Sequence, residues 1–499
     1  MTDRLIFRED AQSDSLAAAA FVAERIESSD GRAEAMNAVV PRLLARGNVD
    51  LAAALSDTID DPYSRDRLLI MVAERCVDIN DDDYARQLAD AIEDDAMRSQ
   101  ALENVAIRTA ARGDSEAARK IASEVVHPDY VEAAIAARAA ADGDRDTATA
   151  TIAAIEFSGA KVVAYQEIAS SAIRNDRATV AVDFLNDAVV AAAGTEHAEE
   201  KIRSLCNIGS LFVDAGRNDL AAETFLRARK FAQQLDNVHR DNFLSSCAVG
   251  LIHSEHLDEA DATMDLISDK TQMASAMLGL ARDEWRRNEK EAAFETLDEA
   301  YEILRSQHEK ETRDSRARNA LIGAIAVQYA GFGKTEKAVS IAEEVLDLED
   351  QVSALSQIAR ILIVQKEDDL SRAAIAKIPD EASRCLAMIG VSNELRKREG
   401  NEAATGVLDE VFQMSNAIDR PVAKSQVLSE TAKRLFAGDL PEKARQVSLT
   451  NFEVIATIRD ESKRGESLAA ASEIYESGKL EIGDQEKAAL LEIMKKSPF

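Results

Sequence analysis

A small residue recurs along this chain at intervals of about 30 to 45 residues, and this spacing restricts the fold more than any other feature. A polar turn that contains Gly, Asn or Asp precedes most of these positions. The positions are Ala52, Ala85, Ala118, Ala148, Ala181, Ala221, Ala260, Ala293, Ala338, Ser371, Thr405 and Ala444. A repeat of this length predicts helical hairpins stacked in tandem, because each hairpin buries its apolar face only against its neighbours.

Residues 205–228 (LCNIGSLFVDAGRNDLAAETFLRA) show the pattern most clearly. Apolar residues recur at helical spacing on both sides of a polar interruption, at Leu205, Ile208, Phe212, Ala221, Phe225 and Ala228. Gly216 lies inside the interruption, where a left-handed backbone conformation is easiest for glycine. The segment therefore predicts two helices joined by a tight turn, each with one apolar stripe.

This hairpin resembles the tetratricopeptide repeat. The family pattern of a large apolar residue, Leu-Gly, an aromatic residue, Ala and Phe is matched by Leu205, Ile208-Gly209, Phe212, Ala221 and Phe225, whereas Leu replaces the usual Trp and no Pro closes the unit. The resemblance implies an all-α fold. We expect an α-solenoid, a right-handed superhelix of about 12 antiparallel helical hairpins with capping helices.

No linker rich in Pro, Ser or Gly divides the 499 residues, so we expect one continuous array. We predict an N-terminal tail over residues 1–12 and a capping helix with the first repeat helix over 13–46. The hairpins would occupy residues 47–480, and a C-terminal capping helix and tail residues 481–499. Aromatic residues make up only 4% of the chain, which suits close packing of helices and argues against a large sheet.

The formal net charge of -31 disfavours general binding to a nucleic-acid backbone, which requires a basic surface. A solvated acidic outer surface explains the charge, and adaptation to a salty habitat is the alternative. The start of the chain shows no secretory signal and no membrane span, so we predict a cytoplasmic protein without membrane insertion.

The four cysteines form no CxxC pair and lie in apolar helical patterns, which predicts buried thiols in a reducing compartment. Cys206 and Cys247 occupy similar places, three residues before Gly209 and Gly250 respectively. We expect these two thiols on neighbouring helices.

The tetratricopeptide-like register places one face of the first helices along a concave groove. The residues predicted on this face are Arg203, Asn207, Ser210, Asn242, Arg282, Trp285, Arg286, Arg360, Lys397 and Arg398. Several are basic, so we expect a locally positive groove suited to an acidic peptide or a chain terminus. Trp285 has two interpretations: it closes a gap between helices, or it is an exposed anchor for a partner. The Lys and Asn clamp that family members use for chaperone tails is not recognisable.

The search for chemistry gives no catalytic, cofactor or metal site. His253 and His256 are spaced to meet a metal on a helix, but a polar turn with no third ligand is the simpler interpretation. Residues 331–335 (GFGKT) contain Gly-Lys-Thr without the glycine spacing or the strand of a phosphate-binding loop, which predicts a turn between helices.

We therefore predict a non-catalytic scaffold or adaptor that binds a protein or peptide partner, with no cofactor. Two alternatives stay open: an RNA-binding helical repeat of the pentatricopeptide type, and an enzyme or regulator on an α-solenoid with an unrecognised site. The sequence leaves the oligomeric state open.

Overall fold

The computed structural model describes residues 4–306, 315–476 and 480–497, and all regular structure in these ranges is helical. The first helices of the repeats are α3 (Ser29–Ala45), α5 (Pro62–Asp78), α7 (Asp95–Arg112), α9 (Pro128–Ala141), α11 (Ser158–Arg174), α13 (Ala198–Asp214), α15 (Arg240–His253), α17 (Lys270–Arg286), α19 (Ser315–Gly331), α21 (Leu348–Val364), α23 (Glu381–Glu399), α25 (Pro421–Ala437) and α27 (Glu461–Ala471). The second helices are α4 (Val49–Ser56), α6 (Asp82–Asp90), α8 (Ser115–Ala122), α10 (Arg145–Ala154), α12 (Ala178–Ala193), α14 (Asn218–Ala232), α16 (Leu257–Met264), α18 (Lys290–Arg305), α20 (Thr335–Glu343), α22 (Asp368–Ala376), α24 (Asn401–Met414) and α26 (Pro441–Ile455). The remaining short elements are α1 (Arg8–Ala11), α2 (Ser15–Glu24), the 3-10 turn η1 (Ser415–Ala417), α28 (Glu473–Glu476) and α29 (Asp484–Met494).

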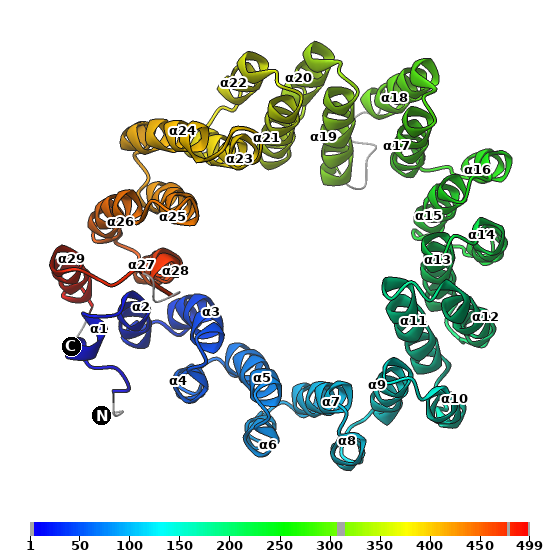
Figure 1. Cartoon of the computed structure of the whole chain (residues 1–499), viewed down its shortest axis with the longest axis horizontal. Coiled ribbons are helices and arrows are strands. Elements are labelled where there is room, and N and C mark those ends of the chain that lie inside the picture. The colour runs from blue at the N-terminus through cyan, green and yellow to red at the C-terminus, as the bar shows by residue number, and fades with distance from the viewer. Residues whose placement is uncertain (1–3, 307–314, 477–479, 498–499) are drawn as a thin grey trace. The chain divides into compact units, whose positions relative to one another are not determined.

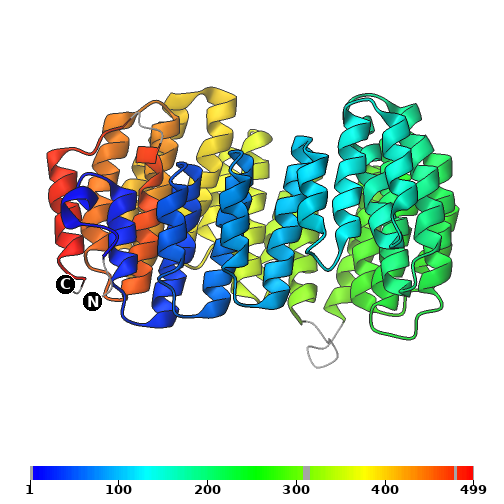
Figure 2. The same ribbon diagram turned by 90° about the horizontal axis from the view of Figure 1, so that it is seen from below.

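Two compact units divide the chain. One unit is Ala106–Ala354, and the other combines Met1–Val105 with Leu355–Phe499. Within each unit the first helices lie in one row and the second helices in another, so the hairpins stack side by side as in an α-solenoid (Figure 1). Figure 2 shows that neighbouring helices of a unit run side by side along their length. The predicted continuity of one array through both units stays a prediction.

The recurring small residue marks a fixed place in the hairpin. It is the fourth residue of the second helix, and its exposed fraction is 0% at every alanine of the series, from Ala52 to Ala444, and 1% at Ser371. A larger side chain at this place would push the second helix away from the first, because helix interfaces are packed without spare volume. The spacing in the sequence therefore reflects one steric requirement repeated along the chain.

The turn before this residue has the same backbone geometry in most of the hairpins. A residue with positive φ lies two positions before the second helix in eleven hairpins of the described part, at Gly47, Asn80, Gly113, Gly143, Asp176, Gly216, Glu255, Asn288, Gly333, Lys366 and Asp439. In the hairpin of α13 and α14, Gly216 (φ 72°) donates its N–H to the Val213 carbonyl, and Arg217 donates to the Phe212 carbonyl at 2.8 Å. These two bonds satisfy carbonyls that the end of the helix leaves without a partner.

The hairpin of α23 and α24 departs from this rule and corrects the predicted register. Gly400, with a φ of 94°, directly precedes the second helix, so the turn is one residue shorter. The fully buried fourth residue is consequently Ala404, while Thr405 is half-buried and donates its hydroxyl to the Asn401 carbonyl at 2.7 Å. The assignment of Thr405 was wrong by one position.

The two ends of the chain meet within one unit. Helix α27 packs against both α2 and α3, and α29 packs against α26 and α2 (Figure 1). All residues of α2 except Ala17 are buried, so this helix has no polar outer face of the kind that a free terminal repeat needs. Gly465 of α27 allows the close approach, because a Cβ there would lie 3.2 Å from the Cβ of Ala35 in α3. The N-terminal helix α2 takes the place of a second helix beside α27.

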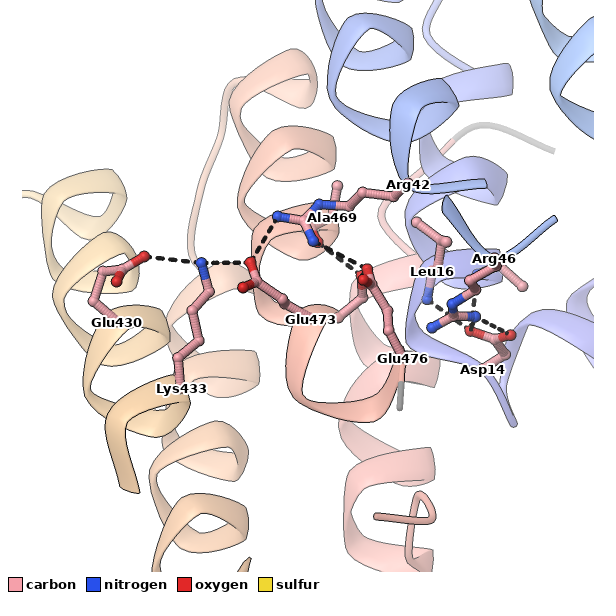
Figure 3. A network of polar contacts seen from close by, with 11 residues as sticks. Asp14, Leu16, Arg42, Arg46, Glu430, Lys433, Ala469, Glu473 and Glu476 are labelled. Atoms are coloured by element: carbon pink, nitrogen blue, oxygen red, sulfur yellow. Dashed lines mark hydrogen bonds and ion pairs between the residues drawn. The ribbon is translucent and has the colours of Figure 1, made fainter. Parts of the chain in front are cut away.

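Ion pairs accompany this junction (Figure 3). Arg42 of α3 points between Glu473 and Glu476, with N–O distances of 3.1 and 3.0 Å, and Lys433 of α25 reaches Glu473 at 2.7 Å. On the other side of the junction, Lys463 and Ser462 of α27 bind the carboxylate of Glu34 and hold its pKa below the usual value. Because exposed ion pairs contribute little free energy, apolar packing of α2 supplies most of the stability here.

Candidate functional site

The hairpin of α13 and α14 sets up a gap between two first helices. The ring of Phe225, from the second helix α14, lies against Gly209 of α13 and Gly250 of α15. A Cβ at Gly209 would come within 2.7 Å of this ring, and a Cβ at Gly250 would overlap it. Glycine at both places therefore lets an aromatic ring fill the space between neighbouring first helices.

A polar cleft of about 500 Å³ opens above this ring. Its walls come from the first helices α13, α15 and α17, and Phe225 is its one contribution from a second helix. The lining residues are Arg203, Cys206, Asn207, Ser210, Phe225, Asn242, Phe243, Ser245, Ser246, Val249, Gly250, His253, Gln272 and Ser275. Four of the ten predicted groove residues, Arg203, Asn207, Ser210 and Asn242, are thus brought together.

No Asp or Glu is among these lining residues, although the chain carries a net charge of -31. Arg203 is exposed and makes no ion pair within the described ranges. The amide of Asn242 reaches the Gln272 side chain at 3.5 Å, and the hydroxyls of Ser210 and Ser246 donate to carbonyls of their own helices. The cleft therefore presents a guanidinium and several neutral hydrogen-bonding groups.

The next three predicted residues lie at the C-terminal end of α17 and do not line the cleft. The ring of Trp285 is half-buried and stacks on Phe332, with centroids 4.1 Å apart and planes at 11°, and it meets the edge of Phe294 at 5.8 Å. Arg282 donates to Gln328 of α19 at 2.8 Å, and Arg286 pairs with the buried Asp283. Trp285 therefore closes a gap between hairpins, the first of its two interpretations.

The last three predicted residues belong to the other unit. Arg360 of α21 is exposed, and its side chain lies beside Gly390 of α23. Lys397 pairs with Glu394 on its own helix at 3.1 Å. Arg398 donates two hydrogen bonds of 2.7 Å to Asp368, which raises the pKa of the guanidinium and lowers that of the carboxyl group. Lys397 and Arg398 are thus already engaged with carboxylates.

A second hollow, of about 300 Å³, lies in this other unit between α22 and α24, over α23. Apolar side chains such as Ile375, Met388 and Val407 form most of its lining. The charged residues at its edge are paired, for example Arg372 with Glu410 at 3.1 Å. This hollow offers an apolar surface without a free charge.

Sequence reasoning missed several residues of the polar cleft. Ser246 follows Asn242 by one helical turn, and Ser275 follows Gln272 in the same way, so both share a face with a polar neighbour. This one-turn spacing from a polar neighbour was the signal in the sequence that could have identified Ser246 and Ser275. His253 also joins the lining because it ends α15 and points into the cleft, which the turn-like sequence around it concealed.

The two chemical motifs lie where one helix ends and the next begins, and His253 is the last residue of α15. His256 directly precedes α16 and its Nδ1 lies 2.7 Å from the Ser254 carbonyl. Gly333 is the left-handed residue between α19 and α20, so residues 331–335 form the predicted turn between helices. Within the described residues there is no group of three or more His, Cys, Asp or Glu arranged to hold a metal ion. In the same part of the chain, every helix is too short or too polar to cross a bilayer.

No protein-family model matches the chain, and no curated protein matches it. Among solved structures, it is similar to Ton1535 from Thermococcus onnurineus NA1, with 18% identity over 70% of this chain and 97% of that chain and a TM-score of 0.26. It is also similar to the Naa15/Naa10 complex bound to HypK-THB (13% identity, 77% and 68% coverage, TM-score 0.26). A further match is the Cut9–Hcn1 hetero-tetramer of the APC/C (11% identity, 85% and 88% coverage, TM-score 0.21). By its own stacked hairpins, each with a buried small residue at one fixed place, the described part of the chain is a helical-repeat protein.

Proposed function

We propose that this protein is a non-catalytic scaffold that binds an acidic peptide segment or the chain terminus of a protein partner in the polar cleft between α13, α15 and α17. The main support is the absence of carboxylates from the lining residues of a cleft in so acidic a chain, together with Arg203, which has no ion pair in the described part of the chain. A local positive potential in an acidic surface attracts an anionic ligand and orients it.

The neutral side chains of the cleft suit a polypeptide backbone. Asn207, Asn242 and Gln272 come from three adjacent first helices, and each amide offers both donors and an acceptor. An extended segment needs such partners, because its N–H and C=O groups lose water on binding. The planar guanidinium of Arg203 matches a carboxylate with two parallel hydrogen bonds. The volume of about 500 Å³ lies in the range of ligand sites, about 300 to 1,000 Å³.

The groups in the cleft also support a binding role without catalysis. The thiol of Cys206 faces the thiol of Cys247, and no hydrogen bond between described residues joins it to His253. A nucleophile activated for covalent catalysis needs a base within hydrogen-bond reach. The lining therefore serves recognition better than nucleophilic catalysis.

The test is binding of short fluorescein-labelled peptides followed by fluorescence polarisation, with the intact protein. Peptides rich in Asp and Glu with a free C-terminus would be compared with their amidated forms and with their Asn and Gln analogues. We expect the acidic peptides to bind, and we expect Arg203→Glu to weaken this binding at least tenfold, a loss of about 1.4 kcal/mol. Added salt should weaken the interaction as well.

Arg360→Glu is the matched control, since Arg360 is an exposed guanidinium in the other unit that makes no ion pair within the described residues. It should leave the affinity unchanged. Loss of binding on amidation would identify the chain terminus as the recognised group, and loss only in the Asn and Gln analogues would identify the acidic side chains. Equal weakening by both charge reversals, or undiminished affinity for amidated Asn and Gln peptides, which carry no carboxylate, would refute the proposed cleft.

A further inference from the structure

Two thiols lie side by side at the wall of the cleft. Cys206 in α13 and Cys247 in α15 lie on neighbouring helices, as their equivalent places in the sequence predicted, and their Sγ atoms are 3.8 Å apart. Cys206 is partly exposed and lines the cleft, whereas the exposed fraction of Cys247 is 0%. The two sulfur atoms are not joined by a disulfide bond in the structure.

The other two cysteines provide an internal comparison. Cys76 and Cys385 are buried and free, and burial raises the pKa of each thiol to about 11. Contact with Cys206 and then burial raise the pKa of Cys247 as well. Reaction from solvent needs access to the thiolate, so Cys206 is the one cysteine that combines an open approach with a second thiol at contact distance.

We propose that Cys206 and Cys247 form a dithiol site that is converted to an intramolecular disulfide by low-molecular-weight disulfides entering the cleft. The inference stands on the thiol geometry and does not depend on peptide binding. The sulfur atoms must approach by about 2 Å to reach the bonded distance. Rotation of the two side chains and a small shift of the helices can supply this movement, because α13 and α15 already pack against each other.

The reaction has two exchange steps. The Cys206 thiol gives up its proton, its sulfur attacks one sulfur of the small disulfide, and the S–S bond of the reagent breaks to release one small thiol that takes up a proton. The Cys247 thiol then loses its proton and attacks the Cys206 sulfur of the mixed disulfide, releasing the second small thiol. In total two protein thiols are oxidised and one small disulfide is reduced to two thiols.

The product would connect the first helices α13 and α15 at the wall of the cleft. Phe225 packs against both helices at Gly209 and Gly250, one helical turn beyond the cysteines. A covalent bond at this level would fix the spacing between α13 and α15 and hence the width of the cleft. The chain between the two cysteines contains the whole of α14, so the bond would also enclose the hairpin that supplies the ring.

The experiment uses the full chain and oxidised glutathione as the probe, with intact-mass spectrometry after unreacted thiols are blocked under denaturing conditions. We expect the oxidised wild-type protein to take up two blocking groups where the untreated protein takes up four, because Cys206 and Cys247 are no longer free. Apart from the blocking groups it should be lighter by about 2 Da, the mass of two hydrogens, and should retain no glutathione. Digestion without a reductant should give one cross-linked pair of peptides that contains Cys206 and Cys247. The double variant Cys76→Ser/Cys385→Ser should close as completely as the wild type.

The single variants separate the two steps. Cys247→Ser should stop at a stable glutathione adduct on Cys206, while Cys206→Ser should remain unmodified because Cys247 is buried. Peptide mapping of the wild-type protein keeps the test independent of how well the variants fold. A stable adduct on wild-type Cys206 without closure, a cross-link that involves Cys76 or Cys385, or modification of Cys206→Ser at the wild-type rate would each overturn the proposal.

Discussion

The two units differ in how far apart in sequence their packing partners lie. In the unit Ala106–Ala354, the principal contacts join helices that are one or two elements apart, such as α13 with α14 and α15. In the other unit, α2 packs against α27, and Arg42 and Glu476 form an ion pair although 434 residues separate them. The first unit is built from local contacts, whereas the second is complete only when both ends of the chain are present.

The hollows of the two units differ in whether their basic residues are paired with carboxylates. In the polar cleft Arg203 has no carboxylate partner among the described residues, while in the second unit Arg398 and Arg372 are paired with Asp368 and Glu410. A free charge in a recess is available to a ligand, and a paired charge mainly fixes the position of its own helices. Basic residues that the sequence places on the same helical face therefore serve different purposes in different repeats.

The largest expected effect tests the meeting of the chain ends. Leu16 of α2 is fully buried, so Leu16→Ala should cost about 2 to 5 kcal/mol through lost packing and the cavity left behind. Because α2 covers α27, we expect hydrogen-exchange protection to fall in residues 461–471 as well as in residues 15–45. Hydrogen exchange followed by mass spectrometry checks both segments in one experiment.

Leu185→Ala in α12 is the control for this prediction, since Leu185 is also fully buried but lies in the unit of local contacts. Its effect should stay near residues 158–214 and leave α27 protected. If Leu16→Ala left residues 461–471 unchanged, the packing of the two chain ends against each other would be refuted.

A smaller effect is expected from overpacking the glycine beside the polar cleft. Gly209→Leu would collide with the Phe225 ring and should cost about 1 to 3 kcal/mol in the stability of the α13–α15 region. Gly406 of α24 has open space where a Cβ would lie, so Gly406→Ala should instead stabilise its helix by about 0.5 to 1 kcal/mol. Urea unfolding of the two variants measures the expected loss of stability at Gly209 and the expected gain at Gly406. If Gly209→Leu were as stable as the wild type, the contact of Gly209 with the Phe225 ring would be refuted.

The smallest effect comes from the ion pair of Arg398 and Asp368. Hydrogen bonds from Arg398 lower the pKa of Asp368 in the folded state, so the pair contributes stability above the ordinary carboxyl pKa of about 4 and loses it as the pH falls further. Asp368→Asn should therefore cost at most about 1 kcal/mol near neutral pH, because the pair is partly exposed, and should cost nothing at low pH.

The measurement is the difference between the urea midpoints of Asp368→Asn and the wild type across the acidic pH range. Arg203→Met in the polar cleft should show no such pH-dependent difference, since Arg203 has no ion pair in the described structure. If the difference in urea midpoint between Asp368→Asn and the wild type stayed constant down to the lowest pH, the ion pair would not be the cause of that difference.

The sequence predicted the hairpins well because each depends on local chemistry. A buried alanine at the fourth residue of the second helix and a turn with a left-handed residue leave a readable period, and both occur in the structure. The register failed at Thr405, where the turn at Gly400 is one residue shorter. Glu255 and Lys366 adopt the left-handed conformation without glycine, which residue type alone would not indicate.

The candidate site was only partly predictable. Helical periodicity placed Arg203, Asn207 and Asn242 on one face, and the structure gathers them at one cleft. The same periodicity could not show that Trp285 stacks on Phe332, or that Arg398 is held by Asp368, because these contacts join different helices through side-chain geometry. Whether a charged side chain is free to bind a ligand depends on its neighbours in space. The position of the residue on one helical face does not specify those neighbours.

By itself, the sequence determined the all-helical hairpins and the spacing of their buried small residues, because these follow from short-range periodicity and turn chemistry. Tertiary structure alone decided that α2 packs against α27, that the thiols of Cys206 and Cys247 come to 3.8 Å, and that one cleft is free of carboxylates. The physical reason is that helix-to-helix packing is set by the fit of side chains from distant segments, and this fit exists only once the chain has brought those segments together.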